Sequence, residues 1–170
     1  MPTSRLELLT TWGRIVVTLS AGRVTDCRLP RVPDLPRGQP AVERVVRAVQ
    51  PGDEAAADQA EAFVRAALNG QAARCPPLQP PAAGPFVQRA WQALARVRRG
   101  EVISYGELAR RSGSPRAMRA AGQACATNAL PLFIPCHRVL AAGGRLGGFT
   151  GGLAWKRHLL AGEGGAGVAS

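Results

Sequence analysis

The sequence predicts an α+β protein with a small N-terminal α/β domain and a mainly helical C-terminal domain that contains a helix-turn-helix. Alternating apolar residues near the start are typical of strands. Capping and turn signals recur after residue 85 and indicate short helices. Five prolines among residues 75–85 exclude a helix or a central strand between these parts. We therefore expect domains at 1–80 and 81–170, with a disordered tail after about residue 164.

The N-terminal part is predicted to place strands before helices. Two strands, Leu6–Leu9 and Arg14–Leu19, flank a turn at 11–13, and a third follows at Val24–Leu29. After a proline-rich loop at 30–40, apolar spacing predicts amphipathic helices at about 41–49 and 54–68. The second of these helices should end at Asn69-Gly70.

The C-terminal part is predicted to contain three consecutive helices. Pro85 can open the first, which should stop near Arg99-Gly100. Ser104 and Glu107 fit a capping box, so a short helix should run to about Arg111. A turn at 113–115 then precedes a third helix, capped by Ser114, that continues to Ala126. Two short helices joined by a tight turn predict the helix-turn-helix.

Charge and cysteine usage narrow the class of protein. Residues 1–80 hold ten Lys and Arg against eight Asp and Glu, whereas residues 81–170 hold twelve against three. This asymmetry suggests contact with a polyanion, although a solvated cationic surface would give the same count. Four irregularly spaced cysteines and two histidines favour neither a disulfide framework nor a zinc site, so we expect no metal and no cofactor. Without a membrane-length apolar run or a signal-peptide pattern, we expect a cytoplasmic monomer with no membrane partner.

The segment Phe133–Leu140 carries the clearest chemical signal. Cys136 stands directly before His137 among apolar neighbours. A thiol becomes a nucleophile when a base or a positive field favours loss of its proton, and His137 and Arg138 can supply both. The alternative is a strand in which the cysteine is only a small buried apolar residue.

The third predicted helix has an unusual surface for a protein that reads DNA. Arg116, Arg119 and Gln123 fall on neighbouring faces among alanines and a glycine. Small residues allow close approach of another surface but offer few groups that could read base edges. We therefore expect phosphate-dominated DNA binding with weak sequence preference. An alanine-rich core helix is the alternative.

Six ordered segments connect this sequence with a known family. They are Gly100–Tyr105, Arg119–Gly122, Asn128, Ile134–Val139, Gly151–Ala154 and Lys156-x-x-Leu-Leu-x-x-Glu163-Gly164. Residues 86–164 thereby resemble the C-terminal domain of the 6-O-alkylguanine-DNA alkyltransferases. The resemblance implies a winged-helix-like C-terminal domain and a ribonuclease-H-like N-terminal domain, which the first eighty residues match only in size and coarse pattern.

The resemblance implies suicidal repair, in which Cys136 takes the alkyl group from 6-O-alkylguanine, and from 4-O-alkylthymine, in double-stranded DNA. Consecutive residues of an extended segment point to opposite sides, so His137 would act on the thiol through a water. Glu163 would orient His137, and we expect this relay to lower the thiol's pKa. Because a stacked guanine is inaccessible, the nucleotide must first be flipped.

The resemblance also assigns residues to DNA. Tyr105 would help to rotate the nucleotide and donate to the leaving guanine, Arg119 would fill the vacated stack, and Asn128 would pin the turn before Cys136. The main chain at Cys136 and Val139 would accept from the base. The remaining residues assigned to DNA or base contact are Arg116, Gln123, Phe149 and Thr150. Cys125, where many members have methionine, is expected on the packing side of its helix.

Three other classes compete with alkyl transfer. A lesion-binding relative would recognise alkylated DNA without repairing it, but such relatives lack the cysteine found here at position 136. A helix-turn-helix transcription factor is disfavoured by the alanine-rich third helix. A cysteine hydrolase is weaker still, because nothing suggests how the product would be turned over.

Overall fold

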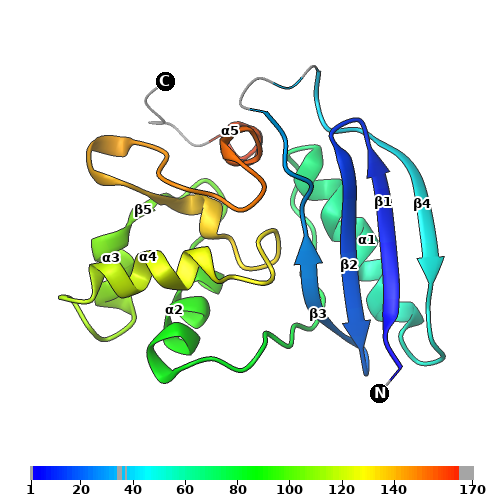
Figure 1. The fold of residues 1–170 in the computed structure, drawn as a ribbon, viewed down its shortest axis with the longest axis horizontal. Coiled ribbons are helices and arrows are strands. Elements are labelled where there is room, and N and C mark those ends of the chain that lie inside the picture. Colours follow the sequence, from blue (N-terminus) through cyan, green and yellow to red (C-terminus); the bar gives the residue numbers. More distant parts are fainter. Residues whose placement is uncertain (1, 34–35, 37, 165–170) are drawn as a thin grey trace.

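A computed structural model describes residues 2–33, 36 and 38–164, so the tail expected after residue 164 lies outside the described residues. The fold is mixed α/β, with an antiparallel sheet and five α-helices in this part of the chain (Figure 1). No helix in the described part is both long and apolar enough to cross a membrane.

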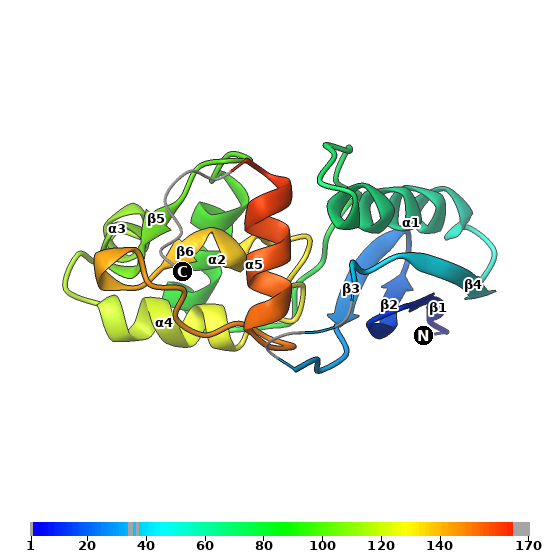
Figure 2. The ribbon, with the colours of Figure 1, turned by 90° about the horizontal axis from the view of Figure 1, so that it is seen from above.

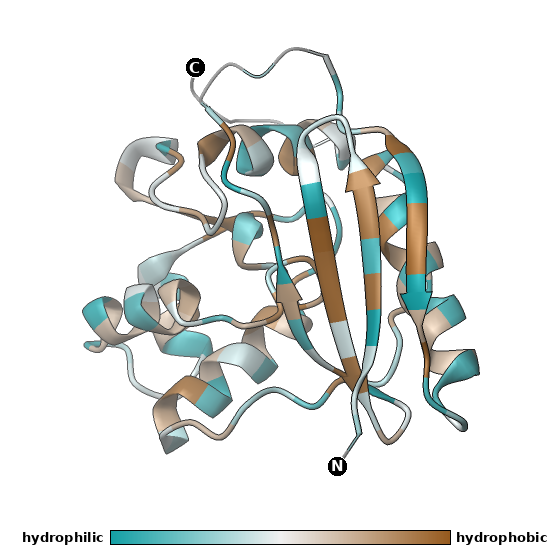
Figure 3. Cartoon of the chain, turned by 45° about the vertical axis from the view of Figure 1, so that its right-hand side comes forward, coloured by the Kyte–Doolittle hydropathy of each residue, from teal (hydrophilic) through white to brown (hydrophobic). Residues whose placement is uncertain are grey.

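The sheet is four-stranded and antiparallel, in the order β3-β2-β1-β4. Its side chains alternate between a buried and a more exposed face, which appears as alternating hydropathy along β1 in Figure 3. Figure 2 shows α1 covering one face of the sheet. The elements of this half are β1 (Ser4–Thr10), β2 (Gly13–Ser20), β3 (Arg23–Arg28), β4 (Val42–Ala48) and α1 (Glu54–Leu68).

The first three strands and α1 are confirmed, but the helix expected at 41–49 is wrong. This segment is strand β4, in which Val45 pairs with Leu8 of β1. The apolar spacing of the segment follows the helical period, whereas its β-branched valines favour a strand. The free edge of β1 supplies backbone hydrogen-bond partners that local spacing cannot reveal.

The proline-rich segment after α1 runs along the edge of β3. The Val24 amide donates to the Pro77 carbonyl at 2.9 Å, and the Gln79 amide donates to the Val24 carbonyl at 2.8 Å. The chain then enters the helical half. Its elements are α2 (Pro85–Ala95), β5 (Ile103–Ser104), α3 (Tyr105–Arg111), α4 (Met118–Ala126), η1 (Cys136–Arg138), β6 (Val139–Leu140), η2 (Ala142–Gly144) and α5 (Leu153–Gly162). Strands β5 and β6 pair in parallel.

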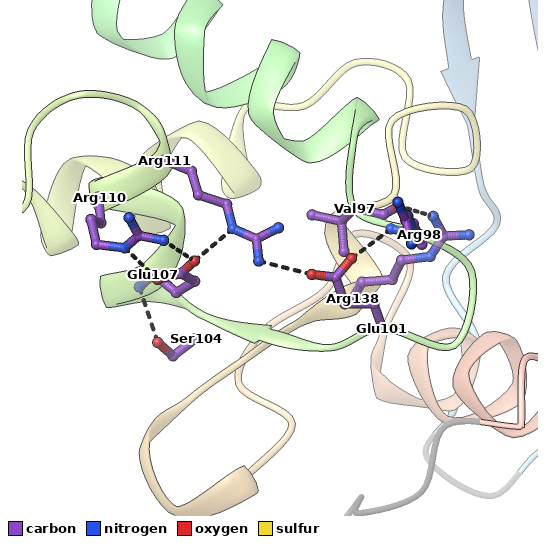
Figure 4. Close-up of polar contacts among 8 residues, drawn as sticks. All are labelled: Val97, Arg98, Glu101, Ser104, Glu107, Arg110, Arg111 and Arg138. Atoms are coloured by element: carbon purple, nitrogen blue, oxygen red, sulfur yellow. Dashed lines mark hydrogen bonds and ion pairs between the residues drawn. The ribbon is translucent and has the colours of Figure 1, made fainter.

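The capping box is confirmed in its first half, because the Ser104 hydroxyl accepts from the Glu107 amide at 3.0 Å. The Glu107 carboxylate instead accepts from Arg110 and Arg111, and Arg111 also reaches Glu101 at 2.8 Å (Figure 4). These contacts hold α3 against the segment before it. The order α3-turn-α4 matches the predicted helix-turn-helix.

Two helix boundaries differ from expectation. The first helix, α2, ends at Ala95 rather than near Arg99, because the Val97 amide donates to the Leu94 carbonyl at 3.0 Å and tightens the last turn. The third helix begins at Met118 without a side-chain cap, because residues 114–117 form a turn closed by an Ala117 to Ser114 backbone bond of 2.9 Å.

One apolar core extends across both halves of the chain. Phe63 of α1 stacks on Phe133, with ring centroids 5.0 Å apart. The Trp155 indole of α5 donates to the Pro30 carbonyl at 2.9 Å, and the Cys27 amide of β3 donates to the Ala129 carbonyl at 2.8 Å. The segment before Cys136 is therefore braced from the sheet side.

Candidate active site

A short 3₁₀ turn, η1, presents the thiol of Cys136, and Asn128 fixes that turn. The Asn128 amide donates to the Ile134 carbonyl at 2.8 Å and to Cys136 Sγ at 3.2 Å, while its carbonyl accepts from the Leu130 amide at 2.9 Å. Cys136 is only 4% exposed and Asn128 only 5%. The turn after α4 is thus held by an amide that also contacts the thiol.

His137, which directly follows Cys136 and is buried, forms a pair with the partly buried Glu163. His137 Nε2 lies 2.9 Å from Glu163 Oε1 at the end of α5. Arg138 donates to both oxygens of the same carboxylate, at 2.9 and 2.8 Å, and to the Val97 carbonyl at 2.6 Å (contact with Val97 in Figure 4). The expectation of an extended segment at 136–137 is wrong, because tight local bonds fold it into η1.

The second ring nitrogen of His137 is the available base. In the described part of the chain, Nδ1 of His137 is the buried side-chain nitrogen or oxygen atom that lacks a hydrogen-bond partner. Burial would raise the pKa of Glu163, but the bonds from His137 and Arg138 outweigh it and hold this pKa at about 2. Because Glu163 is ionised, its Oε1 can only accept a hydrogen bond, so the proton of neutral His137 lies on Nε2. The lone pair of His137 Nδ1 is then free to accept a proton.

The thiol itself is not activated at rest. Burial raises the pKa of Cys136 to about 11, although the Asn128 bond and the Lys156 charge act in the opposite direction. This net shift is opposite in direction to the lowering expected from the His137-Glu163 relay, whose own effect on the thiol stays a prediction. Burial also lowers the pKa of His137 below its usual 6.5, against the opposing effect of Glu163. At neutral pH the site holds a thiol beside a neutral imidazole, and the proton must leave during the reaction.

A cavity of about 360 Å³ lies above the thiol. Tyr105 enters it from the start of α3, and Phe149 and Thr150 enter from the loop before α5, so three predicted residues converge on Cys136. Its full lining is Tyr105, Gly122, Cys125, Ala126, Cys136, Gly148, Phe149 and Thr150. Phe149 also meets the His137 ring edge-on, with centroids 6.3 Å apart.

Cys125 packs against the core, which confirms its expected position on the packing side of the helix, and it also lines this cavity. Positions 122, 125 and 126 are spaced three and four residues apart, so they share one face of α4. That face turns toward the loop at 148–150. The remaining predicted residues of α4, Arg116 just before it, Arg119 and Gln123, are exposed and do not line the cavity.

Lys156 is a site residue that sequence reasoning missed. Its side chain is fully buried, and Nζ donates to the carbonyls of Val139 at 2.6 Å, Gly148 at 3.3 Å and Leu146. The bonds tie β6 to the loop that walls the cavity, and burial lowers the lysine pKa to about 8. The sequence signal that could have identified Lys156 is that it is the single lysine of an arginine-rich chain. The Val139 carbonyl, expected to accept from a base, retains a second lone pair.

Comparison with known proteins identifies relatives of the helical half. The family model "6-O-methylguanine DNA methyltransferase, DNA binding domain" matches residues 85–165. The human methylated-DNA–protein-cysteine methyltransferase is 51% identical over 74 residues, which is 44% of this chain and 36% of that protein. The Haemophilus influenzae protein of that name is 48% identical over 84 residues, 49% and 46% of the two chains. The matched region thus spans less than half of each curated relative.

Solved structures extend the likeness to both halves. Mycobacterium tuberculosis OGT in complex with DNA is 31% identical, covers 92% of this chain and 90% of that chain, and has a TM-score of 0.70. The M. tuberculosis O6-methylguanine methyltransferase is 28% identical, with 94% and 92% coverage and a TM-score of 0.68. The site combines a buried cysteine with a histidine held on a partly buried glutamate, in a region that matches a DNA-binding-domain model. The chain belongs to the methylated-DNA–protein-cysteine methyltransferase family.

Proposed function

We propose that this chain repairs double-stranded DNA by moving the alkyl group of 6-O-alkylguanine, or of 4-O-alkylthymine, to Cys136. The observation that carries this proposal is the thiol at the cavity wall, bonded to Asn128 and followed by a histidine held on Glu163. The transfer occurs once per molecule, because a thioether has no easy leaving path.

The chemistry follows from the protonation states. His137 Nδ1 takes the thiol proton through an intervening water as Cys136 Sγ attacks the alkyl carbon in line. The carbon–oxygen bond breaks and its electron pair leaves with the base. Tyr105, at the cavity wall, donates a proton to the leaving base and regains one from the imidazolium. The thiol proton thus ends on the repaired base, and glutamate charge stabilises the transient imidazolium.

The DNA contacts follow from the exposed surface of α4. The target nucleotide leaves the stack and enters the cavity, where Phe149 contacts the alkyl group and Thr150 lies near the reactive oxygen. Arg119 fills the vacated stack. Arg116 and Gln123, both exposed, contact the duplex near the backbone. The main chain at Cys136 and Val139 accepts from the flipped base.

The finer organisation is part of the same proposal. The sheet and α1 form a ribonuclease-H-like domain that ends near residue 80. A winged-helix-like domain begins at residue 81, and in it β5 and β6 accompany α3 and α4. Four free thiols suit a reducing compartment, which favours a cytoplasmic monomer.

Intact-mass measurement tests the proposal directly. The protein is mixed with excess duplex DNA that contains 6-O-methylguanine, and a single methyl should be gained and mapped to Cys136. Cys136→Ser should bind the same DNA and gain nothing. Several turnovers per molecule, or methylation of Cys125 in place of Cys136, would contradict suicidal transfer to Cys136.

A further inference from the structure

Two of the four free cysteines line the same cavity. Cys125 comes from α4 and Cys136 from η1, eleven positions further along the sequence, and both line this cavity. Of the other two, Cys27 is buried in β3 and Cys75 is exposed before α2. The fold therefore concentrates a pair of thiols where the proposed repair reaction uses only one.

Asn128 connects the two thiol-bearing residues. Its main-chain amide donates to the Cys125 carbonyl at 3.3 Å, and its side chain donates to Cys136 Sγ at 3.2 Å. Cys136 is buried, whereas Cys125 is half-buried and so partly accessible. Burial, and then the charge of a Cys136 thiolate, raise the pKa of Cys125 to about 12, so the Cys125 thiol lies close enough to be affected by charge on Cys136.

The cavity suits a ligand whose central atom bonds to two thiols and carries its third substituent with it. Its volume of about 360 Å³ is near the lower end of the range for small-molecule pockets, so a ligand inside it contacts several walls. In the described part of the chain, no three His, Cys, Asp or Glu side chains gather to hold a metal ion. A trivalent organoarsenical needs only two thiols, and Tyr105 and Phe149 offer aromatic walls to an aryl substituent.

We propose that Cys125 and Cys136 form a two-thiol binding site for trivalent organoarsenicals, and that occupancy of this site blocks the alkyl-acceptor sulfur. Two arsenic–sulfur bonds form, the arsenic–oxygen bond of an arylarsine oxide breaks, and the two thiol protons leave with that oxygen as water. Arsenic stays trivalent and both sulfurs keep their oxidation state. The site deepens the proposed function, since its effect on repair rests on Cys136 being the alkyl acceptor.

Phenylarsine oxide and the full chain provide the test. Intact mass should show one phenylarsenic group with loss of water, retained in excess monothiol and removed by a vicinal dithiol. Cys125→Ser and Cys136→Ser should each lose this retention, with apparent affinity lower by about a hundredfold or more, because the second bond is then no longer intramolecular. Cys75→Ser is the matched control and should behave like the unaltered chain. A circular dichroism melt checks that each variant folds.

A second arm avoids mutation. The chain is first consumed by 6-O-methylguanine DNA and then exposed to phenylarsine oxide, and it should no longer retain the arsenical against monothiol. Retention that survives in Cys125→Ser, or an adduct mapped to Cys27 or Cys75, would overturn the two-thiol site. The intact-mass measurement of phenylarsine oxide binding uses no DNA, so it can succeed even if the chain transfers no alkyl group. Alkyl transfer can likewise succeed if the chain does not retain the arsenical. Inhibition of repair by phenylarsine oxide is measured in the unaltered chain, Cys125→Ser and Cys75→Ser, each against its own untreated rate.

Discussion

Glu163 receives three hydrogen bonds from two side chains, and these bonds determine how His137 can react. One comes from His137 and two from Arg138. They keep the glutamate ionised, place the histidine proton on Nε2 and leave Nδ1 as the base. A neutral residue at 163 could keep the shape of this arrangement while losing its charge.

We expect Glu163→Gln to slow methyl transfer by roughly 10²–10⁴-fold, the usual contribution of general acid–base catalysis, with little loss of DNA affinity. Loss of the carboxylate charge lowers the His137 pKa further, so the acid limb of the rate profile should move to lower pH. Single-turnover rates against pH measure both effects. His137→Ala serves as the comparison, and unchanged rates in both variants would contradict the relay.

The pKa values separate two routes to the thiolate. If His137 takes the thiol proton during the attack, the rate of methyl transfer should rise as the pH passes through the lowered pKa of His137. Above that pKa the histidine is neutral and the rate should level off. If the thiolate formed first, a thiol pKa of about 11 would make the rate climb tenfold per pH unit. Measurement between pH 6 and 7 keeps Lys156 mostly charged, because its pKa is about 8. A tenfold climb per unit in this window would refute the His137 route.

At the scale of elements, α4 has two working faces. The face at Gly122, Cys125 and Ala126 closes the cavity, and Arg119 and Gln123 point to solvent. The buried Ala121 and Ala124 hold the helix against its neighbours, where the Trp91 indole donates to the Ala124 carbonyl at 2.8 Å. Small side chains therefore serve both packing and cavity shape.

We expect Arg119→Ala to slow repair in duplex DNA by at least about tenfold, equal to 1.4 kcal/mol, while transfer from the free alkylated base stays nearly unchanged. The free base needs no flipping, so it isolates the stack-filling role. Arg116→Ala, a neighbouring exposed arginine, is the control for charge alone. If Arg119→Ala and Arg119→Lys lose the same activity, and both losses follow the salt dependence of binding, Arg119 is only a phosphate contact.

At the scale of the whole molecule, the two halves meet at a pair of glycines. A Cβ at Gly70, just after α1, would lie 2.7 Å from the Gly162 carbonyl oxygen at the end of α5. Arg99 donates to the carbonyls of both glycines. Because Glu163 follows directly, this contact helps to position the carboxylate that holds His137.

We expect Gly70→Ala to lower the unfolding free energy and to slow repair. Gly22→Ala is a matched control, since Gly22 has a similar positive φ of 72° against 64° at Gly70 but nothing within 4 Å of its Cβ. The two variants share backbone strain, and only Gly70→Ala adds a steric clash. The excess loss should be at least about 1 kcal/mol, or about 2–4 °C in Tm. Equal melting temperatures and equal repair rates would show that the glycine contact contributes nothing.

Local signals were sufficient where the determinant lay within a few residues. The turn at 11–13 and the Ser104 cap follow from side chains that act on the nearby backbone. The end of α1 at Asn69-Gly70 follows from a glycine with a positive φ. The Cys136-His137 pair and the order of the resemblance segments likewise pointed to the site. Strand β4 could not be predicted from local spacing, because its partner is the edge of β1.

The sequence by itself determined the acceptor thiol, its neighbouring imidazole and the family in which both occur. Only the tertiary structure decided that burial raises the pKa of this thiol, that Cys125 lines the same cavity and that Lys156 fastens the cavity wall. The physical reason is that pKa values and cavity lining depend on burial and on partners distant in sequence. Spacing along the chain identifies which groups are present, whereas packing sets their environment.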